Sequence, residues 1–380
     1  MAGNGYTDFE RLVVKIGSAL LVDDTGRLNR SWLAALLADI ADIRYAGRQV
    51  LIVSSGAVAL GCASLGLNRQ RARLEELQAA AATGQVRLAQ AYQELLAERH
   101  IPVAQILVTP DDTEVRRRFL NARGTLEKLL ELGVVPVINE NDTVATDELQ
   151  YGDNDRLAAR VAQMVMADGL VLLSDVDGLY SADPGQCATA VHIATVDDIS
   201  DEIVTAAGDS GSRVGSGGMR TKVQAARIAT RAGCATLIAN GRVQRPLAAL
   251  AAGARCTLFR AAATPAAARK RWLAGMLEVR GELRLDAGAS RALRGGSSLL
   301  PVGIVEVVGR FERGDAVMLV DAAGGEFGHG LVAYSSVEVS AIHGCRSAEI
   351  EARLGYRGRT VVVHRDDLVL FPQSGREAAR

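Results

Sequence analysis

The chain has 380 residues, of which 48% are hydrophobic, 23% charged and 4% aromatic. This balance is typical of a globular protein, and the length predicts two or three domains. The formal net charge of −1 excludes a strongly basic protein of the kind that nucleic acids or anionic membranes attract, and the scarcity of aromatic residues argues against a base-stacking platform.

Over the first 260 residues, short apolar runs alternate with segments of helical periodicity. Continuous apolar strands separated by helices are typical of a mostly parallel sheet that is covered on both faces. We therefore predict an α/β fold, a three-layer αβα sandwich. Strands are expected at residues 12–16, 50–53, 104–108, 134–138, 170–173 and 235–239, and helices at 31–46, 75–98, 121–132, 157–166 and 219–232.

The sequence changes character after residue 260. Residues 261–271 are small, interrupted by proline and then basic, which indicates a linker or a bridging helix. Short apolar runs with glycine pairs between them follow, and they predict a small β-barrel or sandwich of about 80 residues. We place the large domain at residues 8–260, a linker at 261–279 and the small domain at 280–360. The strands expected in the small domain are 281–285, 303–308, 316–320 and 330–334.

We expect a cytoplasmic protein that does not cross a membrane. Residues 1–10 lack the basic start of a secretory signal. The uncharged stretch at 49–68 is long enough to span a bilayer, but its serines and glycines favour a strand, a turn and a helix. The five cysteines are odd in number and include no CxxC pair, which suggests neither a disulfide framework nor a zinc site.

Ligands of open α/β sheets bind beyond the carboxyl ends of the strands, and polar groups follow several strands here. Lys15 could direct its ammonium group at a phosphate, and Gly17 would let backbone N–H groups approach it; a lysine that reaches solvent is the alternative. Ser54, Ser55 and Gly56 follow the second strand, where they offer hydroxyl donors or simply cap a helix.

Two further places carry dense polar groups. Residues 139–142 and 152–155 hold carboxylates and amides that are costly to leave unused beside a core, although solvated turns are the alternative. Residues 216–222 place two glycines and Lys222 at a helix start, which forms an anion site unless the segment is only a flexible loop. Two lysines and paired acids, without a Ser/His/Asp set, suggest phosphoryl transfer.

These motifs resemble those of the glutamate 5-kinases, which have the amino acid kinase fold. Residues 296–301 are similar to part of a PUA domain, so the resemblance covers about residues 11–370. Ser174 stands where the family often has threonine, and the hydroxyl is kept. The resemblance rests on residues 13–17, 54–56, 119–123, 135–142, 152–155, 178–180, 182–184, 217–219 and 221–222.

The resemblance implies that ATP phosphorylates L-glutamate to L-glutamyl 5-phosphate with Mg²⁺, the first step of proline biosynthesis. It implies that Lys15 and Lys222 stabilise the transferred phosphoryl group and that Asp155 orients them. Glutamate would be held by Ser55, Asp142, Asn154 and Asn139. ATP would be held by Lys15, Gly17, Ser174, Asp175, Ser216, Gly217, Gly218, Met219, Arg220, Thr221 and Lys222. No metal ligands are assigned.

Two alternatives stay open. The PUA-like segment could make this an RNA-binding or RNA-modifying protein, but residues 280–380 hold 13 basic and 13 acidic residues, whereas RNA binding usually needs a basic surface. The kinase could instead phosphorylate another small carboxylate, such as aspartate or N-acetylglutamate. The family resemblance further implies a homo-oligomer, dimer or tetramer, and feedback inhibition by L-proline.

Overall fold

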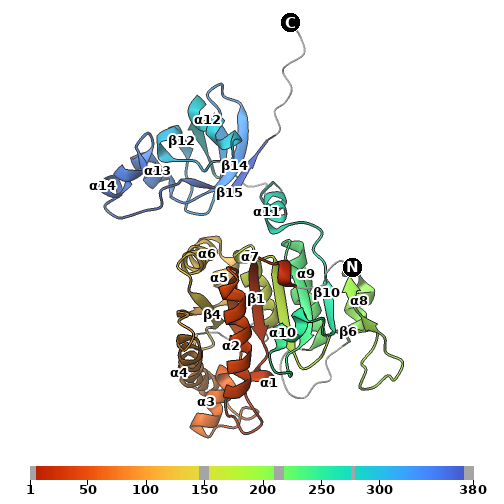
Figure 1. The fold of residues 1–380 in the computed structure, drawn as a ribbon. Helices are drawn as coiled ribbons and strands as arrows, with labels where there is room; N and C mark the ends of the chain where they lie inside the picture. The colour runs from red at the N-terminus through yellow and green to blue at the C-terminus, as the bar shows by residue number, and fades with distance from the viewer. Residues whose placement is uncertain (1–5, 145–153, 209–217, 275–278, 372–380) are drawn as a thin grey trace. The chain divides into compact units, whose positions relative to one another are not determined.

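The computed structural model describes residues 6–144, 154–208, 218–274 and 279–371. The chain divides into two compact units, Met1–Pro265 and Ala266–Arg380. Figure 1 shows the elements of both. Within the described ranges, no helix is long and apolar enough to cross a membrane.

The first unit is built on an eight-stranded sheet with the order β3-β4-β2-β1-β5-β9-β10-β8. Neighbouring strands are parallel from β3 to β9, whereas β10 is antiparallel to β9 and β8 is parallel to β10. A separate antiparallel pair joins β6 and β7. The strands are β1 (Arg11–Ile16), β2 (Gln49–Ser54), β3 (Val103–Val108), β4 (Val135–Glu140), β5 (Gly169–Ser174), β6 (Leu179–Tyr180), β7 (His192–Ile193), β8 (Thr195–Val196), β9 (Ala235–Asn240) and β10 (Cys256–Phe259).

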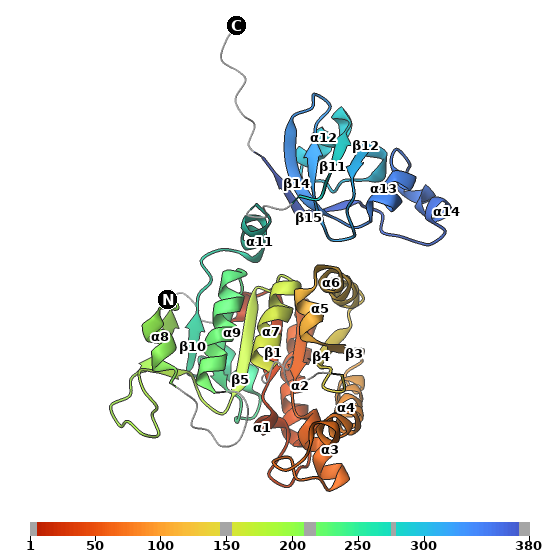
Figure 2. The ribbon, with the colours of Figure 1, turned by 180° about the vertical axis from the view of Figure 1, so that it is seen from behind.

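Helices cover both faces of this sheet. Figure 1 shows α2 and α10 in front of the strands, and Figure 2 shows α7 and α9 on the opposite face. The helices are η1 (Tyr6–Asp8), α1 (Ser18–Leu21), α2 (Arg30–Tyr45), α3 (Ala57–Leu65), α4 (Leu74–Ala97), α5 (Pro110–Glu114), α6 (Arg116–Glu131), α7 (Asn154–Met164), α8 (Asp201–Ala206), α9 (Met219–Arg231) and α10 (Pro246–Ala251).

Strand alternation divides the interior into two cores. Leu12, Val14 and Ile16 of β1 pack with α2 and α4, whereas Val13 packs with α7 and α9. Successive strand residues point to opposite faces, so an uninterrupted apolar strand is buried on both sides. The predicted three-layer α/β fold is therefore confirmed, including its six parallel strands. The short strands β6, β7, β8 and β10 were not predicted.

The second unit contains a five-stranded sheet with the order β12-β11-β13-β14-β15. An isolated bridge between Leu299 and Val363 also links β15 to the segment before β12. The small β-domain is confirmed, although β15 was not predicted. Its elements are α11 (Pro265–Ala274), β11 (Gly281–Leu285), α12 (Ala287–Arg294), η2 (Pro301–Gly303), β12 (Ile304–Gly309), β13 (Ala316–Val320), β14 (Glu326–Val332), α13 (Ser336–Ile342), η3 (Ser347–Glu349), α14 (Ile350–Leu354) and β15 (Val363–Leu370).

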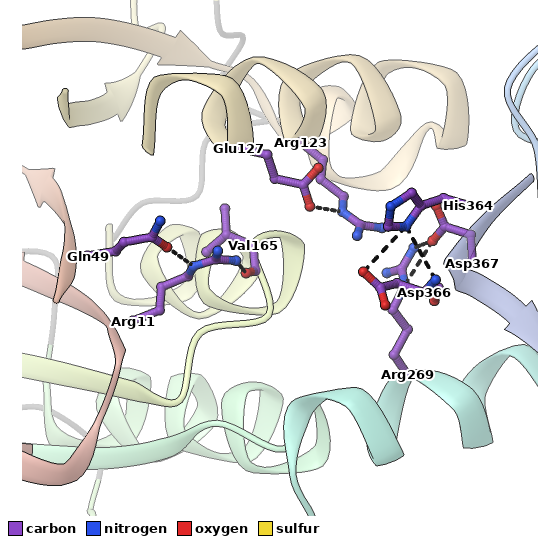
Figure 3. Close-up of polar contacts among 9 residues, drawn as sticks. All are labelled: Arg11, Gln49, Arg123, Glu127, Val165, Arg269, His364, Asp366 and Asp367. Carbon is purple, nitrogen blue, oxygen red and sulfur yellow. Dashed lines mark hydrogen bonds and ion pairs between the residues drawn. The ribbon is translucent and has the colours of Figure 1, made fainter. Parts of the chain in front are cut away.

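Arginine side chains tie elements together within each unit (Figure 3). In the first unit, Arg11 at the start of β1 donates to Gln49 of β2 at 2.8 Å and to the carbonyl oxygen of Val165, just after α7. In the second unit, the Nε of Arg269 on α11 donates to Asp367 of β15 at 3.0 Å. Each contact pairs a guanidinium with an oxygen acceptor, so these arginines help to hold neighbouring elements together.

Candidate active site

Two lysines meet one carboxylate at the carboxyl end of the parallel sheet. Lys15 lies in β1, Asp155 in the first turn of α7 and Lys222 in the first turn of α9. The Nζ of Lys15 forms an ion pair with Oδ1 of Asp155, and the Nζ of Lys222 lies 3.1 Å from Oδ2. Each carboxylate oxygen therefore has its own ammonium partner. The structure brings together the three residues that were expected to be catalytic.

The local sequence explains how these side chains converge. Lys15 lies two residues after Val13, on the face of the sheet that α7 and α9 cover. Gly218 is the N-cap of α9, and the hydroxyl of Thr221 donates to the Gly218 carbonyl oxygen at 2.8 Å. This contact braces the first helical turn, so that Lys222 extends back toward Asp155.

The three charged groups of this cluster are withdrawn from water. Lys15 and Lys222 are each 5% exposed and Asp155 is fully buried. Two ammonium groups therefore lie side by side in a site with little access to water. Ammonium groups held in such a site can stabilise an anion such as a phosphoryl group.

A second cluster joins the ends of β2 and β4 to the start of α7 through amide hydrogen bonds. The Nδ2 of Asn154 donates to the carbonyl oxygen of Ser54 at 2.7 Å, to Oγ of Ser55 at 3.0 Å and to Oδ1 of Asn139 at 2.9 Å. Three of the residues expected to bind glutamate, Ser55, Asn139 and Asn154, are thus in direct contact.

Two buried polar residues of α4 support this cluster, and they were missed by the sequence analysis. The Oε1 of Gln85 accepts from Nδ2 of Asn139 at 2.8 Å, and the hydroxyl of Tyr92 lies 3.0 Å from Oγ of Ser54. Burial raises the pKa of Tyr92, which keeps its hydroxyl protonated. The available signal was their spacing, because residues seven apart lie on the same face of a helix.

Asp142, the fourth residue expected to bind glutamate, follows β4. Burial raises the pKa of its carboxyl group to about 6, although the positive charge of Arg69 opposes the shift. A carboxylate that titrates near neutrality and is partly withdrawn from water is typical of a functional site. The structure does not record a hydrogen bond that joins Asp142 to the amide cluster among the described residues.

The residues expected to bind ATP lie along the same edge of the sheet. Ile16 is in register with Ser54 of β2 and Leu173 of β5, which places Gly17 and Ser174 at neighbouring strand ends. The hydroxyl of Ser174 donates to Asp175 at 3.1 Å, and Asp175 lies 3.7 Å from Arg242. Gly218, Met219, Arg220, Thr221 and Lys222 open α9, whereas Ser216 and Gly217 lie outside the described residues.

The part of the chain that the structure describes contains no group of three or more His, Cys, Asp and Glu that could hold a metal ion. Asp155, the carboxylate at the centre of the site, already faces two ammonium groups. Mg²⁺ usually keeps several waters and binds through substrate phosphates with one or two carboxylates. Binding of this kind does not require a group of three protein ligands.

Comparison with known proteins identifies similar chains. The family model described as "Amino acid kinase family" matches residues 10–240, and that of the "PUA domain" matches residues 281–354. The chain is 58% identical over 362 residues to the glutamate 5-kinase of Paramagnetospirillum magneticum (strain ATCC 700264 / AMB-1), which covers 95% of this chain and 98% of that protein.

A second relative is glutamate 5-kinase 1 of Rhizobium meliloti (strain 1021), which is 55% identical over 374 residues, covering 98% of this chain and 95% of that protein. Among solved structures, the UMP kinase of Bacillus anthracis has a TM-score of 0.46 at 16% identity and covers 67% of this chain and 98% of that chain.

Proposed function

Because this chain belongs to the amino acid kinase family and, within it, to the glutamate 5-kinases, we propose that Lys15, Asp155 and Lys222 form its phosphoryl-transfer centre. The enzyme transfers the γ-phosphoryl group of ATP to the side-chain carboxylate of L-glutamate. The product is L-glutamyl 5-phosphate, and the reaction belongs to proline biosynthesis. The alternative of an RNA-binding or RNA-modifying protein is not favoured.

The reaction needs charge stabilisation more than proton transfer. The side-chain carboxyl group of glutamate has a pKa of about 4.3, so at neutral pH it is already the anionic nucleophile. One of its oxygens forms a bond to the γ-phosphorus as the bond to the bridging oxygen of ADP breaks. No general base is required, which agrees with a site built from lysines.

The lysine pair offsets the repulsion between the two anionic substrates. Lys15 and Lys222 approach Asp155 from different elements, β1 and α9, and each is held by its own carboxylate oxygen. We assign the two ammonium groups to the oxygens of the transferred phosphoryl group and Asp155 to their orientation. This shared carboxylate is the observation that carries the proposal, because preorganised charge is most effective in a dry site.

The substrates are assigned to the two neighbouring clusters. Ser55, Asn139, Asp142 and Asn154 hold glutamate in this proposal. The amide and hydroxyl groups of Ser55, Asn139 and Asn154 converge, and the family resemblance adds the carboxylate of Asp142. ATP extends from the lysines along the strand ends and the start of α9. Its residues are Lys15, Gly17, Ser174, Asp175, Ser216, Gly217, Gly218, Met219, Arg220, Thr221 and Lys222.

We also propose that Mg²⁺ enters with the nucleotide, as part of the substrate MgATP, because Mg²⁺ usually keeps several waters and binds through substrate phosphates. Assembly into a dimer or tetramer and inhibition by L-proline remain proposals from the family resemblance. The division into a catalytic domain at 8–260, a linker at 261–279 and a PUA-like domain at 280–360 is also a proposal, and it rests on the change of sequence pattern after residue 260. A cytoplasmic location agrees with five free cysteines.

A hydroxylamine trap tests the activity. The purified chain is incubated with MgATP and hydroxylamine, and L-glutamate, L-aspartate or N-acetylglutamate is offered in separate reactions. Hydroxylamine attacks the carbonyl carbon of an acyl phosphate and converts it to a hydroxamate. We expect hydroxamate only in the reaction that contains L-glutamate. Hydroxamate with another acceptor would support the phosphoryl-transfer mechanism but change the assignment of the substrate. No hydroxamate from folded protein would contradict the proposed function.

A further inference from the structure

A line of hydrogen bonds leads from Gln85 on α4 through Asn139 to Asn154, in the cluster that is proposed to hold glutamate. We propose that Gln85, at the far end of this line, is a positioning residue that holds the Asn139 amide in place and, through it, the Asn154 amide. Gln85 accepts from Asn139 at 2.8 Å, and Asn139 accepts from Asn154 at 2.9 Å. The inference rests on the proposed function, because it concerns how the same site holds glutamate.

Two backbone groups fix the direction of this line. The N–H of Glu140 can only donate, and it lies 2.9 Å from Asn139, so the amide atom that faces it is Oδ1. The carbonyl oxygen of Ser54 can only accept, so the atom of Asn154 that lies 2.7 Å from it is Nδ2. Asn139 therefore presents Nδ2 to Gln85, and Gln85 must present an acceptor.

This direction decides what Asn154 offers to a ligand. Its Nδ2 serves three acceptors, on Ser54, Ser55 and Asn139, with two hydrogens. The atom that remains for a ligand is Oδ1, which can only accept a hydrogen bond. The α-ammonium group of glutamate supplies such donors, whereas glutarate has no amine. This arrangement, which Gln85 supports by holding Asn139, favours an acceptor bearing an amino group.

The helix that carries Gln85 is held close to the site. Gly84 lies in α4, where a Cβ atom would be 1.9 Å from the carbonyl oxygen of Ala57, and Gly61 meets the carbonyl oxygen of Ala80 in the same way at 1.7 Å. The backbones of α3 and α4 are therefore in direct contact. Gln85 is only 8% exposed, so its amide has little freedom to turn away.

The test replaces Gln85 by Met, which has similar length but a thioether sulfur that accepts hydrogen bonds only weakly. An unsatisfied buried donor is expected to raise the KM for L-glutamate about tenfold. The KM for ATP and the turnover at saturating glutamate should stay the same, and the preference for glutamate over glutarate should fall. Gln90→Met is the matched control, because Gln90 lies on the exposed face of α4.

Three further variants make the test decisive. Gln85→Glu keeps an acceptor oxygen, so its glutamate KM should lie closer to that of the unmodified enzyme than that of Gln85→Met does. In an Asn154→Ala background, Gln85→Met should add nothing, because its effect passes through Asn154. Gln85→Ala removes the acceptor with a smaller side chain and carries the test if the Met variant does not fold.

An unchanged glutamate KM in Gln85→Met or Gln85→Ala would overturn the inference, and so would effects that multiply with those of Asn154→Ala. Equal rises in the KM for ATP and for glutamate would also overturn it, because they indicate general loss of structure. These outcomes leave the proposed function standing. Failure of the unmodified enzyme to phosphorylate glutamate would instead contradict the proposed function itself.

Discussion

At the level of single residues, Lys222 is the side chain whose loss should affect catalysis most directly. Replacement by alanine leaves Asp155 paired with Lys15 but removes one of two ammonium groups from the phosphoryl site. We expect kcat to fall by about 10²–10³, as for other preorganised groups that stabilise transition-state charge. The measurement is ATP-dependent formation of glutamyl hydroxamate at saturating substrates.

The control for this prediction is Lys128→Ala, because Lys128 is exposed on α6 and pairs with Glu131. It should keep normal turnover. A Lys222→Ala enzyme with near-normal kcat would remove Lys222 from the mechanism.

Asp142 should make glutamate binding depend on pH. Burial raises the pKa of its carboxyl group to about 6, so Asp142 loses its negative charge as the pH falls through that value. Glutamate keeps its own side-chain charge there, since its pKa is about 4.3. We therefore expect the KM for L-glutamate to rise as the pH is lowered from 8 to 5.5, with little change in the KM for ATP.

The pH dependence is measured from steady-state kinetics of the unmodified enzyme and of Asp142→Asn. The Asn variant should have a high glutamate KM that varies little over this range. A KM that still rises by the same factor in Asp142→Asn would assign the titration to another group.

The residues proposed to contact the substrates could be chosen from the sequence, but the residues that support them could not. Lys15, Lys222 and Asn154 lie at strand ends or helix starts, where their type indicates ligand binding. Gln85 and Tyr92 lie inside an alanine-rich helix and meet their partners 54 and 38 residues away in the chain. Nothing in the local sequence shows that contact, because it depends on how α4 packs against the strand ends.

At the level of elements, the close contact between α3 and α4 predicts that Gly84→Ala lowers the stability of the protein, whereas helix propensity alone predicts that it raises it. Alanine is favoured over glycine inside a helix by about 1 kcal/mol. In Gly84→Ala, however, the new Cβ would overlap the backbone of α3 at Ala57, and overpacking costs about 1–3 kcal/mol. We expect a lower melting temperature and, because α4 carries Gln85, a higher glutamate KM.

Thermal unfolding and steady-state kinetics of Gly84→Ala check this prediction. An increase in the melting temperature with an unchanged glutamate KM would show that the two helices can separate without cost.

The sequence predicted the main strands and helices better than it predicted the short strands and the strands at the edges of the sheets. Six parallel strands and their main helices were found because apolar runs leave little ambiguity, including β3, which lies at an edge of the sheet and is only partly buried. The strands β8, β10 and β15 were missed, since short strands and strands of mixed polarity at a sheet edge carry weak patterns. Pro136 lies in β4, which has a neighbouring strand on each side, although proline cannot donate a hydrogen bond to a sheet. The register of β4 with β2 begins at the next residue, Val137.

At the level of the whole molecule, the two compact units should differ in what unfolds them. Arg269 and Asp367 are a buried ion pair inside the second unit. Removal of one partner of a buried ion pair typically costs about 3–5 kcal/mol. We expect Arg269→Ala to lower the unfolding temperature of the second unit, while glutamyl hydroxamate formation is retained.

Calorimetry of the full chain beside the activity assay tests this separation. Lys270→Ala is the matched control, since Lys270 is exposed on the same helix, α11. Loss of activity in parallel with the second unit would contradict independent behaviour. The change from an α/β to a β pattern near residue 260 predicted two units, but it could not show that α11 is tied by Arg269 to β15.

The most direct test of the account is the fate of the oxygen atoms of glutamate. L-Glutamate labelled with oxygen-18 in its side-chain carboxylate is incubated with the enzyme, MgATP and hydroxylamine, and the released phosphate is analysed by mass spectrometry. Attack by the carboxylate on the γ-phosphorus predicts one labelled oxygen in each phosphate that accompanies hydroxamate. Unlabelled phosphate would show transfer to water instead, and would contradict the assignment of this site to glutamate phosphorylation.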